Sequence, residues 1–311
     1  MLAGGTGGAR LARGLLDVVG PESLTVIANT GDDIEIYGAY VSPDPDLITF
    51  WLADQVDSRG WGLEGDTFEV MNGLRGLGED VWFNLGDRDL AMGQQRAAAL
   101  AAGARLTEAH AALVSNLGLE GQRGLVLPMS DEPVRTRVLA DGTWHSLQEF
   151  LIVARGQGLI EDVQFTGADV ARATAEVLAA IEQASVILIG PSNPILSIGP
   201  ILAVREIRQA LLSAGAPVVA VSPLVGGKVL KGPTAACMRW AGVPVSAAGV
   251  ARIYDGLIHG LVCDEPVAEI ETLQTDMLLA EPDQRRRLAQ EALAFAANLT
   301  TGRCSSSFPR A

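Results

Sequence analysis

The stretch Leu2-Ala3-Gly4-Gly5-Thr6-Gly7-Gly8-Ala9-Arg10 sets four glycines between a short apolar segment and a helical pattern at 9–19. This pattern predicts a buried strand that turns tightly into a helix, with backbone N–H groups and the positive helix end available to an anion. No Gly-Lys-Ser/Thr follows, and Arg10 stands where a GxGxxG fingerprint has its third glycine, so neither a Walker A loop nor a dinucleotide fingerprint is expected. The residues expected to contact phosphate are Gly5, Thr6, Gly7 and Gly8. A purely structural tight turn is the alternative.

Apolar runs alternate with amphipathic stretches along the chain, which favours a parallel sheet covered by helices on both faces. The expected strands are 1–3, 24–28, 81–85, 184–189, 217–221 and 257–263, and the expected helices are 9–19, 89–102, 169–183, 201–213 and 283–298. Only three residues precede the glycines, so we expect a short or irregular first strand and a natural start upstream.

The segment 104–166 differs, because it suggests antiparallel strands joined at Asp141-Gly142, a dipeptide typical of a tight hairpin turn. We therefore predict an α/β fold, a Rossmann-like doubly wound parallel sheet of strand order 3-2-1-4-5-6. Residues 1–103 and 167–311 would form this nucleotide-binding domain, and 104–166 an inserted α+β subdomain.

In this strand order the crevice for ligands lies at the carboxyl ends of strands 1 and 4. The loop after strand 4 is Gly190-Pro191-Ser192-Asn193-Pro194, whose small polar side chains and amides suit a phosphate. Two prolines restrict this loop. We predict that Ser192 and Asn193 hold phosphate and face the glycines at 4–8.

Aspartates cluster at the end of strand 2, in Asn29-Thr30-Gly31-Asp32-Asp33, and again in Ser42-Pro43-Asp44-Pro45-Asp46-Leu47. Adjacent carboxylates repel one another unless a cation or solvent screens them. Mg²⁺ prefers such oxygen ligands together with substrate phosphates. The predicted catalytic and metal-binding residues are Asp32, Asp33 and Asp46; solvated acids in a turn and a helix cap are the alternative.

Arginines supply two further candidates. Arg88, in Gly86-Asp87-Arg88-Asp89, either forms a surface ion pair or holds a phosphate or a polar ring edge, while Asp87 or Asp89 is expected to cap the following helix. Arg135 and Arg137 could line the mouth of the inserted subdomain, but alternating arginines on a strand more often form a solvated face.

The composition excludes several classes of protein. The 311 residues carry a net charge of −14, which argues against a sequence-independent nucleic-acid binder. No apolar run approaches the roughly 18–20 residues that span a bilayer, and three cysteines without CxxC spacing favour a cytoplasmic protein without a membrane association. The only two lysines, Lys228 and Lys231, lie together in the loop after strand 5, where they could meet a nucleotide.

Seven motifs in this order resemble the 2-phospho-L-lactate transferase family of coenzyme F420 biosynthesis. They are GGTGGARLARGL (4–15), NTGDD (29–33), SPDPDL (42–47), GLGEDVWFNLGDRDLA (76–91), PMSDEPVRT (128–136), GPSNPILSI (190–198) and SPLVGGKVLKGP (222–233). Each motif alone is weak, but the combination covers nearly the whole chain.

The resemblance implies a Mg²⁺-dependent homodimeric transferase with two small-molecule substrates, the deazaflavin Fo and a guanylylated three-carbon acid. A phospho-three-carbon-acid group of phospholactate, phosphoenolpyruvate or phosphoglycerate type would move from a guanosine-diphosphate-linked donor to the ribityl hydroxyl of Fo, releasing GMP. Asp46 and Arg88 match Fo-contacting positions of the family, and Ser222, Gly227 and Lys228 would lie against the guanosine. We expect Asp46→Ala to lose most of the turnover with little change in thermal stability.

Two other functions compete with this interpretation. A related superfamily branch binds a nucleotide sugar and regulates metabolism, but it carries a Gly/Ser-rich extension after its two aspartates, where this chain has Ile34-Glu35-Ile36-Tyr37-Gly38. An NAD-dependent oxidoreductase fits the predicted fold but not the glycine turn. Binding of Fo would favour the transferase, and binding of a UDP-sugar without turnover would favour the regulator.

Overall fold

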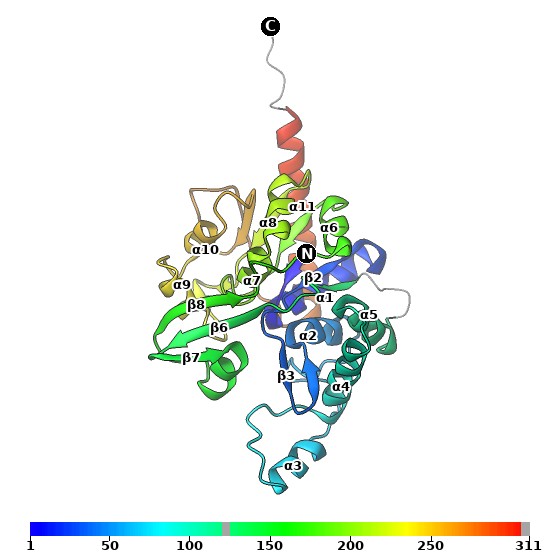
Figure 1. Cartoon of the computed structure of the whole chain (residues 1–311). Coiled ribbons are helices and arrows are strands. Elements are labelled where there is room, and N and C mark those ends of the chain that lie inside the picture. The colour runs from blue at the N-terminus through cyan, green and yellow to red at the C-terminus, as the bar shows by residue number, and fades with distance from the viewer. Residues whose placement is uncertain (120–124, 306–311) are drawn as a thin grey trace.

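A seven-stranded parallel sheet forms the centre of the computed structural model, which describes residues 1–119 and 125–305 (Figure 1). From one edge to the other its strands are β14 (Thr272–Gln274), β13 (Gly260–Cys263), β10 (Val218–Val221), β9 (Ile187–Ile189), β1 (Leu2–Ala3), β2 (Val26–Ala28) and β5 (Val126–Pro128). The predicted strand order is confirmed, and β14 adds a seventh strand.

The third strand was predicted at the wrong place. Residues 81–85 form no strand, and β5 pairs with β2 instead, with Val126 opposite Val26. Val81, Phe83 and Leu85 of this run pack beside a small hairpin of β3 (Ile34–Ile36) and β4 (Ala39–Val41) rather than in the sheet. Pro128 can end β5 because this strand is at the sheet edge, where a missing N–H is tolerated.

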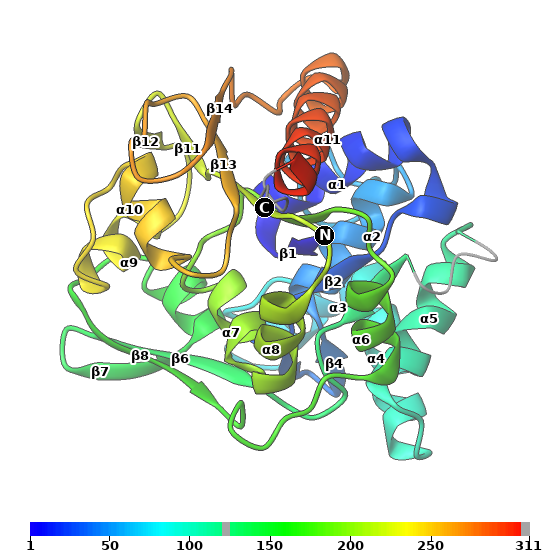
Figure 2. The ribbon, with the colours of Figure 1, turned by 90° about the horizontal axis from the view of Figure 1, so that it is seen from above.

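Side chains alternate between two apolar cores, one on each face of the sheet. Leu2 lies in one core and Ala3 in the other, and the same alternation separates Ile187 and Ile189 from Leu188. One face is covered by α1 (Gly5–Val19), α2 (Pro43–Leu52), α5 (Leu106–Asn116) and α11 (Pro282–Ser305). The other is covered by α6 (Ala175–Glu182), α7 (Ile198–Ala203), α8 (Arg205–Ser213) and α10 (Ala247–Ile253), as Figure 2 shows for α7 and α8 opposite α1 and α11. The doubly wound prediction is therefore confirmed.

All five predicted helices are present with shifted bounds, and α11, for example, ends at Ser305 rather than at 298. The segment 201–213 belongs to two helices, α7 and α8, which meet at Val204. Helix α6 begins only at Ala175, because the Thr174 hydroxyl accepts a hydrogen bond from the backbone N–H of Val177 at 3.2 Å and caps the helix there.

A second, antiparallel sheet lies beside the first. It consists of β7 (Thr143–Ser146), β6 (Arg135–Ala140) and β8 (Ile160–Thr166), in that order. Its hairpin turns at Asp141 and Gly142, whose φ angles of +49° and +75° fit the predicted two-residue turn. Residues 126–128, placed in the insertion by the sequence, instead complete the central sheet. The division into two domains stays a prediction.

The remaining elements lie between those already named along the chain. They are η1 (Pro21–Ser23), α3 (Glu69–Gly76), α4 (Asp87–Ala101), η2 (Glu149–Val153), β11 (Leu224–Val225), β12 (Lys228–Val229) and α9 (Thr234–Trp240). Across the described part of the chain, no helix is long and apolar enough to cross a membrane.

Helices α1 and α11 pack so closely that one position admits only glycine. A Cβ added at Gly14 of α1 would overlap the backbone carbonyl of Arg285 in α11. We expect Gly14→Ala to lower the free energy of unfolding by about 1–3 kcal/mol, because the helices must separate. Thermal unfolding measures this.

Gly73→Ala is the matched control. Gly73 lies on the exposed side of α3, and nothing lies within 4 Å of its added Cβ. This substitution should leave stability unchanged or raise it by up to about 1 kcal/mol. Equal melting temperatures of wild type and Gly14→Ala would contradict the close packing of α1 on α11.

Candidate active site

The loops after β1 and β9 face each other, as the strand order predicts. The backbone N–H of Gly4 donates a hydrogen bond to Ser192 Oγ at 3.1 Å. A Cβ on Gly8 would come within 2.7 Å of the same hydroxyl oxygen, and one on Gly7 would overlap the carbonyl of Pro191. The crevice between β1 and β9 is therefore narrow at this point.

The glycine motif is not a loop. Gly5, with a φ of +63°, begins α1, and Thr6, Gly7 and Gly8 form its first turns. The prediction of a loop here was wrong. Gly7 and Gly8 lie in the helix, and glycine is required at these positions because the helix packs closely against residues 190–194. Phosphate binding by these residues stays a prediction.

Four aspartate carboxylates are buried in one cluster, and one of them, Asp44, accepts a hydrogen bond from the first residue of α1. Asp32 and Asp33 follow β2, while Asp44 and Asp46 lie in the first turn of α2, and their exposed fractions are only 3–7%. Prolines at the start of α2 fix the backbone for this helical turn. The sequence placed Asp44 in the cluster but did not assign it a role.

Asp44 and Asp32 share one neutral donor. Asn29 Nδ2 lies 2.9 Å from Asp44 Oδ2 and 3.4 Å from Asp32 Oδ1. The other oxygen of Asp44 accepts the N–H of Gly5 at 2.5 Å, and that of Asp32 accepts Gln148 Nε2 at 3.2 Å. Burial raises the pKa of Asp44 to about 6. Burial also raises the pKa of Asp32 well above its usual value, and repulsion by Asp44 adds to this effect.

Asp33 is held by two hydroxyl groups. Ser42 Oγ donates to Asp33 Oδ1 at 2.7 Å, and the Tyr40 hydroxyl donates to Oδ2 at 2.9 Å. Burial raises the pKa of Asp33 to about 7, although the positive charge of Arg135 partly opposes this shift. Asp33 therefore exchanges its proton near neutral pH.

Asp46 is neutralised by a buried arginine that the sequence did not reveal. Arg96, which is fully buried in α4, forms a two-pronged ion pair with Asp46: Nη1 lies 3.1 Å from Oδ2, and Nη2 binds Oδ1. Arg96 Nη1 also donates to the carbonyl of Tyr40 at 2.9 Å. The spacing of Arg96 from the buried Leu90 and Gly93 on α4 is the sequence signal that could have revealed it.

A buried histidine completes the surroundings of Asp46. His110 Nδ1 lies 3.9 Å from Asp46 Oδ1, and burial lowers the pKa of His110 to about 3, so the ring is neutral. Removing Asp46 would leave the Arg96 charge unpaired, so the structure makes a large loss of stability the expectation for Asp46→Ala.

Two of the four acids have a donor set that suits Mg²⁺. Within residues 1–119 and 125–305, no group of three or more His, Cys, Asp or Glu side chains could hold a metal ion. Mg²⁺ commonly takes only one or two carboxylates and completes its shell with water and phosphate. Asp32 and Asp44 fit this role, because both face Asn29 and neither has a cationic partner among the described side chains. Asp33 and Asp46 instead use their oxygens on hydroxyl groups and on Arg96.

Arg88 lies apart from this cluster at the start of α4. Its side chain is exposed, and Nη1 donates to the carbonyl of Glu64 at 3.1 Å. The predicted cap was wrong: Asp66 accepts the N–H of Arg88 at 2.9 Å and that of Asp89 at 3.1 Å, whereas Asp87 caps α3. Asp66 belongs to the loop before α3, and these two bonds hold that loop against the start of α4.

The residues predicted after β9 and β10 are largely engaged in local turns. Asn193 Oδ1 accepts the N–H groups of Ile195 and Leu196 at 2.9 and 3.0 Å, and Ser222 Oγ accepts that of Leu224 at 3.2 Å. Both residues lie beside the crevice. Their expected contact with a nucleotide stays a prediction.

The two lysines occupy different surroundings. Lys228 is exposed next to the Gly226-Gly227 turn between β11 and β12, where both glycines have positive φ. The ammonium of Lys231 lies 5.2 Å from the ring centroid of Trp61. Lys231 thus joins the loop after β10 to the loop before α3, while Lys228 stays available to a ligand.

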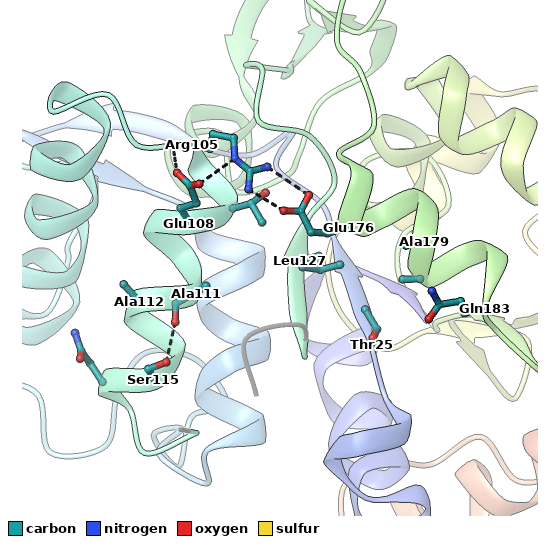
Figure 3. Close-up of a pocket in the computed structure, with 13 residues that line it drawn as sticks. Thr25, Arg105, Glu108, Ala111, Ala112, Ser115, Leu127, Glu176, Ala179 and Gln183 are labelled. Atoms are coloured by element: carbon teal, nitrogen blue, oxygen red, sulfur yellow. Dashed lines mark hydrogen bonds and ion pairs between the residues drawn. The ribbon is translucent and has the colours of Figure 1, made fainter. Parts of the chain in front are cut away.

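Two of the cavities in the described part of the chain differ in their relation to the acid cluster. The larger, about 690 Å³, lies between α5 and α6, where Arg105 bridges Glu108 and Glu176 (Figure 3). None of its lining residues belongs to the acid cluster. A smaller cavity of about 220 Å³ includes Asp32 and Asp33 in its wall.

Comparisons with known proteins agree with the motifs. The family model described as "2-phospho-L-lactate transferase CofD" matches residues 1–296. The chain is 39% identical to a 2-phospho-L-lactate transferase of Methanosarcina mazei over 85% of this chain and 86% of that protein. It is 38% identical to a phosphoenolpyruvate transferase of Thermobifida fusca over 96% of this chain and 98% of that protein.

A solved structure shares the fold. A UPF0052 family protein from Bacillus halodurans superposes with a TM-score of 0.59 at 17% identity, covering 94% of this chain and 97% of that one. This likeness supports the α/β architecture alone.

The raised pKa values of the buried acids make stability depend on pH. Asp33 and Asp44 titrate at about 7 and about 6 in the folded chain, against about 3.9 when unfolded. Between these limits the folded chain holds protons that the unfolded chain has lost, so the free energy of unfolding falls as pH rises from about 4 to 7. Asp33→Asn should flatten this fall by a few kcal/mol. Denaturant unfolding at several pH values, in chelator, measures it.

Asp57→Asn is the control for this series, because Asp57 pairs with Arg59 outside the cluster. It should leave the pH slope unchanged. A wild-type stability that rises steadily from pH 4 to 7 would contradict the buried, partly protonated cluster.

The ion pair of Arg96 and Asp46 is expected to dominate local stability. Arg96→Met leaves the Asp46 carboxylate buried without its partner and should lower the free energy of unfolding by about 3–5 kcal/mol. The double variant Arg96→Met with Asp46→Asn should recover much of the loss, since no unpaired charge remains. A loss below about 1 kcal/mol for the single variant, measured by denaturant unfolding, would refute the pair.

Proposed function

Because the chain belongs to the 2-phospho-L-lactate transferase family, we propose that it attaches a phospho-three-carbon acid to the deazaflavin Fo in coenzyme F420 biosynthesis. It is a transferase acting on phosphorus-containing groups. In the proposed reaction the ribityl hydroxyl oxygen of Fo bonds to the phosphorus that carries the acid. The bond from this phosphorus to the GMP oxygen breaks, and GMP leaves.

The single observation that carries the proposal is the buried acid cluster at the carboxyl ends of β1 and β2. Transfer of a phosphorus group requires mainly positioning and charge stabilisation. Asp32 and Asp44, two buried carboxylates without a cation beside them, would hold Mg²⁺. When bound, Mg²⁺ would neutralise charge that develops on the phosphate oxygens.

Asp33 is proposed as the general base. Its pKa of about 7 lets it lose a proton at neutral pH and accept one from the attacking hydroxyl. Ser42 and Tyr40 fix its orientation. Asp46 instead orients α2 against α4 through Arg96, and its contact with Fo, like that of Arg88, stays a prediction from the family resemblance.

The nucleotide end of the donor is assigned to the loops around the crevice. Phosphates would meet the first turn of α1 and Ser192, and the guanosine would lie along 222–228 with Lys228 beside it. Homodimerisation and a cytoplasmic location are part of the same proposal.

Relatives named for two donor acids are almost equally similar to this chain, at 39% and 38% identity. We therefore propose an acid of the phospholactate or phosphoenolpyruvate type. No described feature favours the nucleotide-sugar-binding regulator.

A turnover assay tests the function. The protein is incubated with Fo, Mg²⁺ and each guanylylated acid in turn, and GMP is quantified by chromatography. We expect Fo-dependent GMP release with one donor. Release with none, together with saturable binding of a UDP-sugar, would replace the proposal by the regulator.

The role of Asp33 predicts a pH profile. The kcat/KM of the wild type should rise as pH passes through about 7, where Asp33 loses its proton. Asp33→Asn should lower kcat by roughly 10²–10⁴-fold and abolish this rise. Asp57→Asn should keep full activity, and a rising profile retained in Asp33→Asn would assign the base to another group.

A further inference from the structure

The 220 Å³ cavity beside the acid cluster has a wall from the second sheet. Residues of the turn after β2 form one side, and residues of β6, β7 and the start of η2 form the other. Those that matter here are Asp32, Asp33, Arg135, Thr136, Arg137 and Gln148. The cavity therefore joins the proposed catalytic carboxylates to the second sheet.

The two arginines in this wall differ in their partners. Arg135 Nη2 lies 3.0 Å from Glu35 Oε1 and 3.2 Å from the Tyr40 hydroxyl, so its charge is engaged. Arg137 forms no ion pair with any described carboxylate. Its guanidinium carbon lies 5.3 Å from the ring centroid of Trp144, an arrangement that leaves N–H groups at the edge of the guanidinium plane available.

The neighbouring residue on β6, Thr136, points to the opposite face of the second sheet. The Thr136 side chain is 2% exposed, and its hydroxyl has no hydrogen-bond partner among the described atoms. Arg137, on the exposed face of β6, is therefore the charged donor that this strand presents to the cavity, whose opposite side carries the acids.

We propose that this cavity binds the three-carbon acid of the donor, with its carboxylate on the Arg137 guanidinium. This inference rests on the proposed function. The acid is bonded through oxygen to the phosphorus under attack, so it must lie directly beside Asp32 and Asp33. An acid carboxylate next to these carboxylates needs a cation at its far end, and Arg137 supplies one.

The size of the cavity agrees with this assignment. Pockets for drug-sized ligands measure about 300–1,000 Å³, so 220 Å³ is too small for guanosine or a tricyclic deazaflavin and suits a small acid. The arginines that the sequence pattern alone would assign to a solvated strand face become the recognition surface for one substrate group.

Steady-state kinetics of the Mg²⁺-loaded protein test the assignment. Arg137→Gln should raise the KM for the guanylylated acid by about 10- to 100-fold and leave the KM for Fo unchanged. Arg137→Lys should restore part of the affinity. Arg75→Gln, which removes an exposed arginine held by Asn72 and Asn84, is the control without effect.

Binding of the free acid separates this proposal from the proposed function. Calorimetric titration with 2-phospholactate or phosphoenolpyruvate should show binding to the wild type and a loss of 10-fold or more in Arg137→Gln, while GMP binds both proteins equally. Equal binding of the acid to both proteins, or no binding to the wild type, would overturn the cavity assignment. Absence of Fo-dependent GMP release from the wild type would overturn the function instead.

Discussion

The structure around the crevice depends on how the charges of four buried aspartates are stabilised. Four carboxylates lie in one buried cluster, but only Asp46 has a cation, Arg96, in direct contact. Since an unpaired buried charge is unfavourable by several kcal/mol, the remaining acids rely on neutral donors and on partial protonation. Asn29, Ser42 and the N–H of Gly5 supply these donors. The segments that carry these donors are thus held in place by their hydrogen bonds to the acids.

The same constraint explains the glycines. Asp44 reaches the first amide of α1, and a Cβ on Gly4 would overlap its carboxylate. The amide that a phosphate would otherwise use at this helix end is thereby occupied by a protein carboxylate. Phosphate binding here depends on the neighbouring amides, on Ser192 or on a cation held by the acids. The glycines at this helix start are consequently explained by close packing against neighbouring protein atoms, and they do not by themselves indicate a phosphate site.

Sequence reasoning recovered the features that depend on local order along the chain. The strand order followed from the glycine turn and the alternation of elements, and the acid cluster followed from its position after β2. It failed where partners are distant in sequence. Arg96 meets Asp46 across fifty residues, and no local pattern shows which aspartate of α2 it will choose. Likewise the apolar run at 81–85 does not reveal whether it joins the sheet or a satellite cluster.

A net charge of −14 is compatible with anionic substrates once the location of each charge is known. The cluster concentrates negative charge where a cation would be held, while the second sheet brings arginines to the opposite wall of the same cavity. Positive charge is scarce in the chain but lies within reach of the acids, in positions that the central sheet itself does not provide. In the proposed reaction, the second sheet would therefore bind a substrate carboxylate that the buried acids alone would repel.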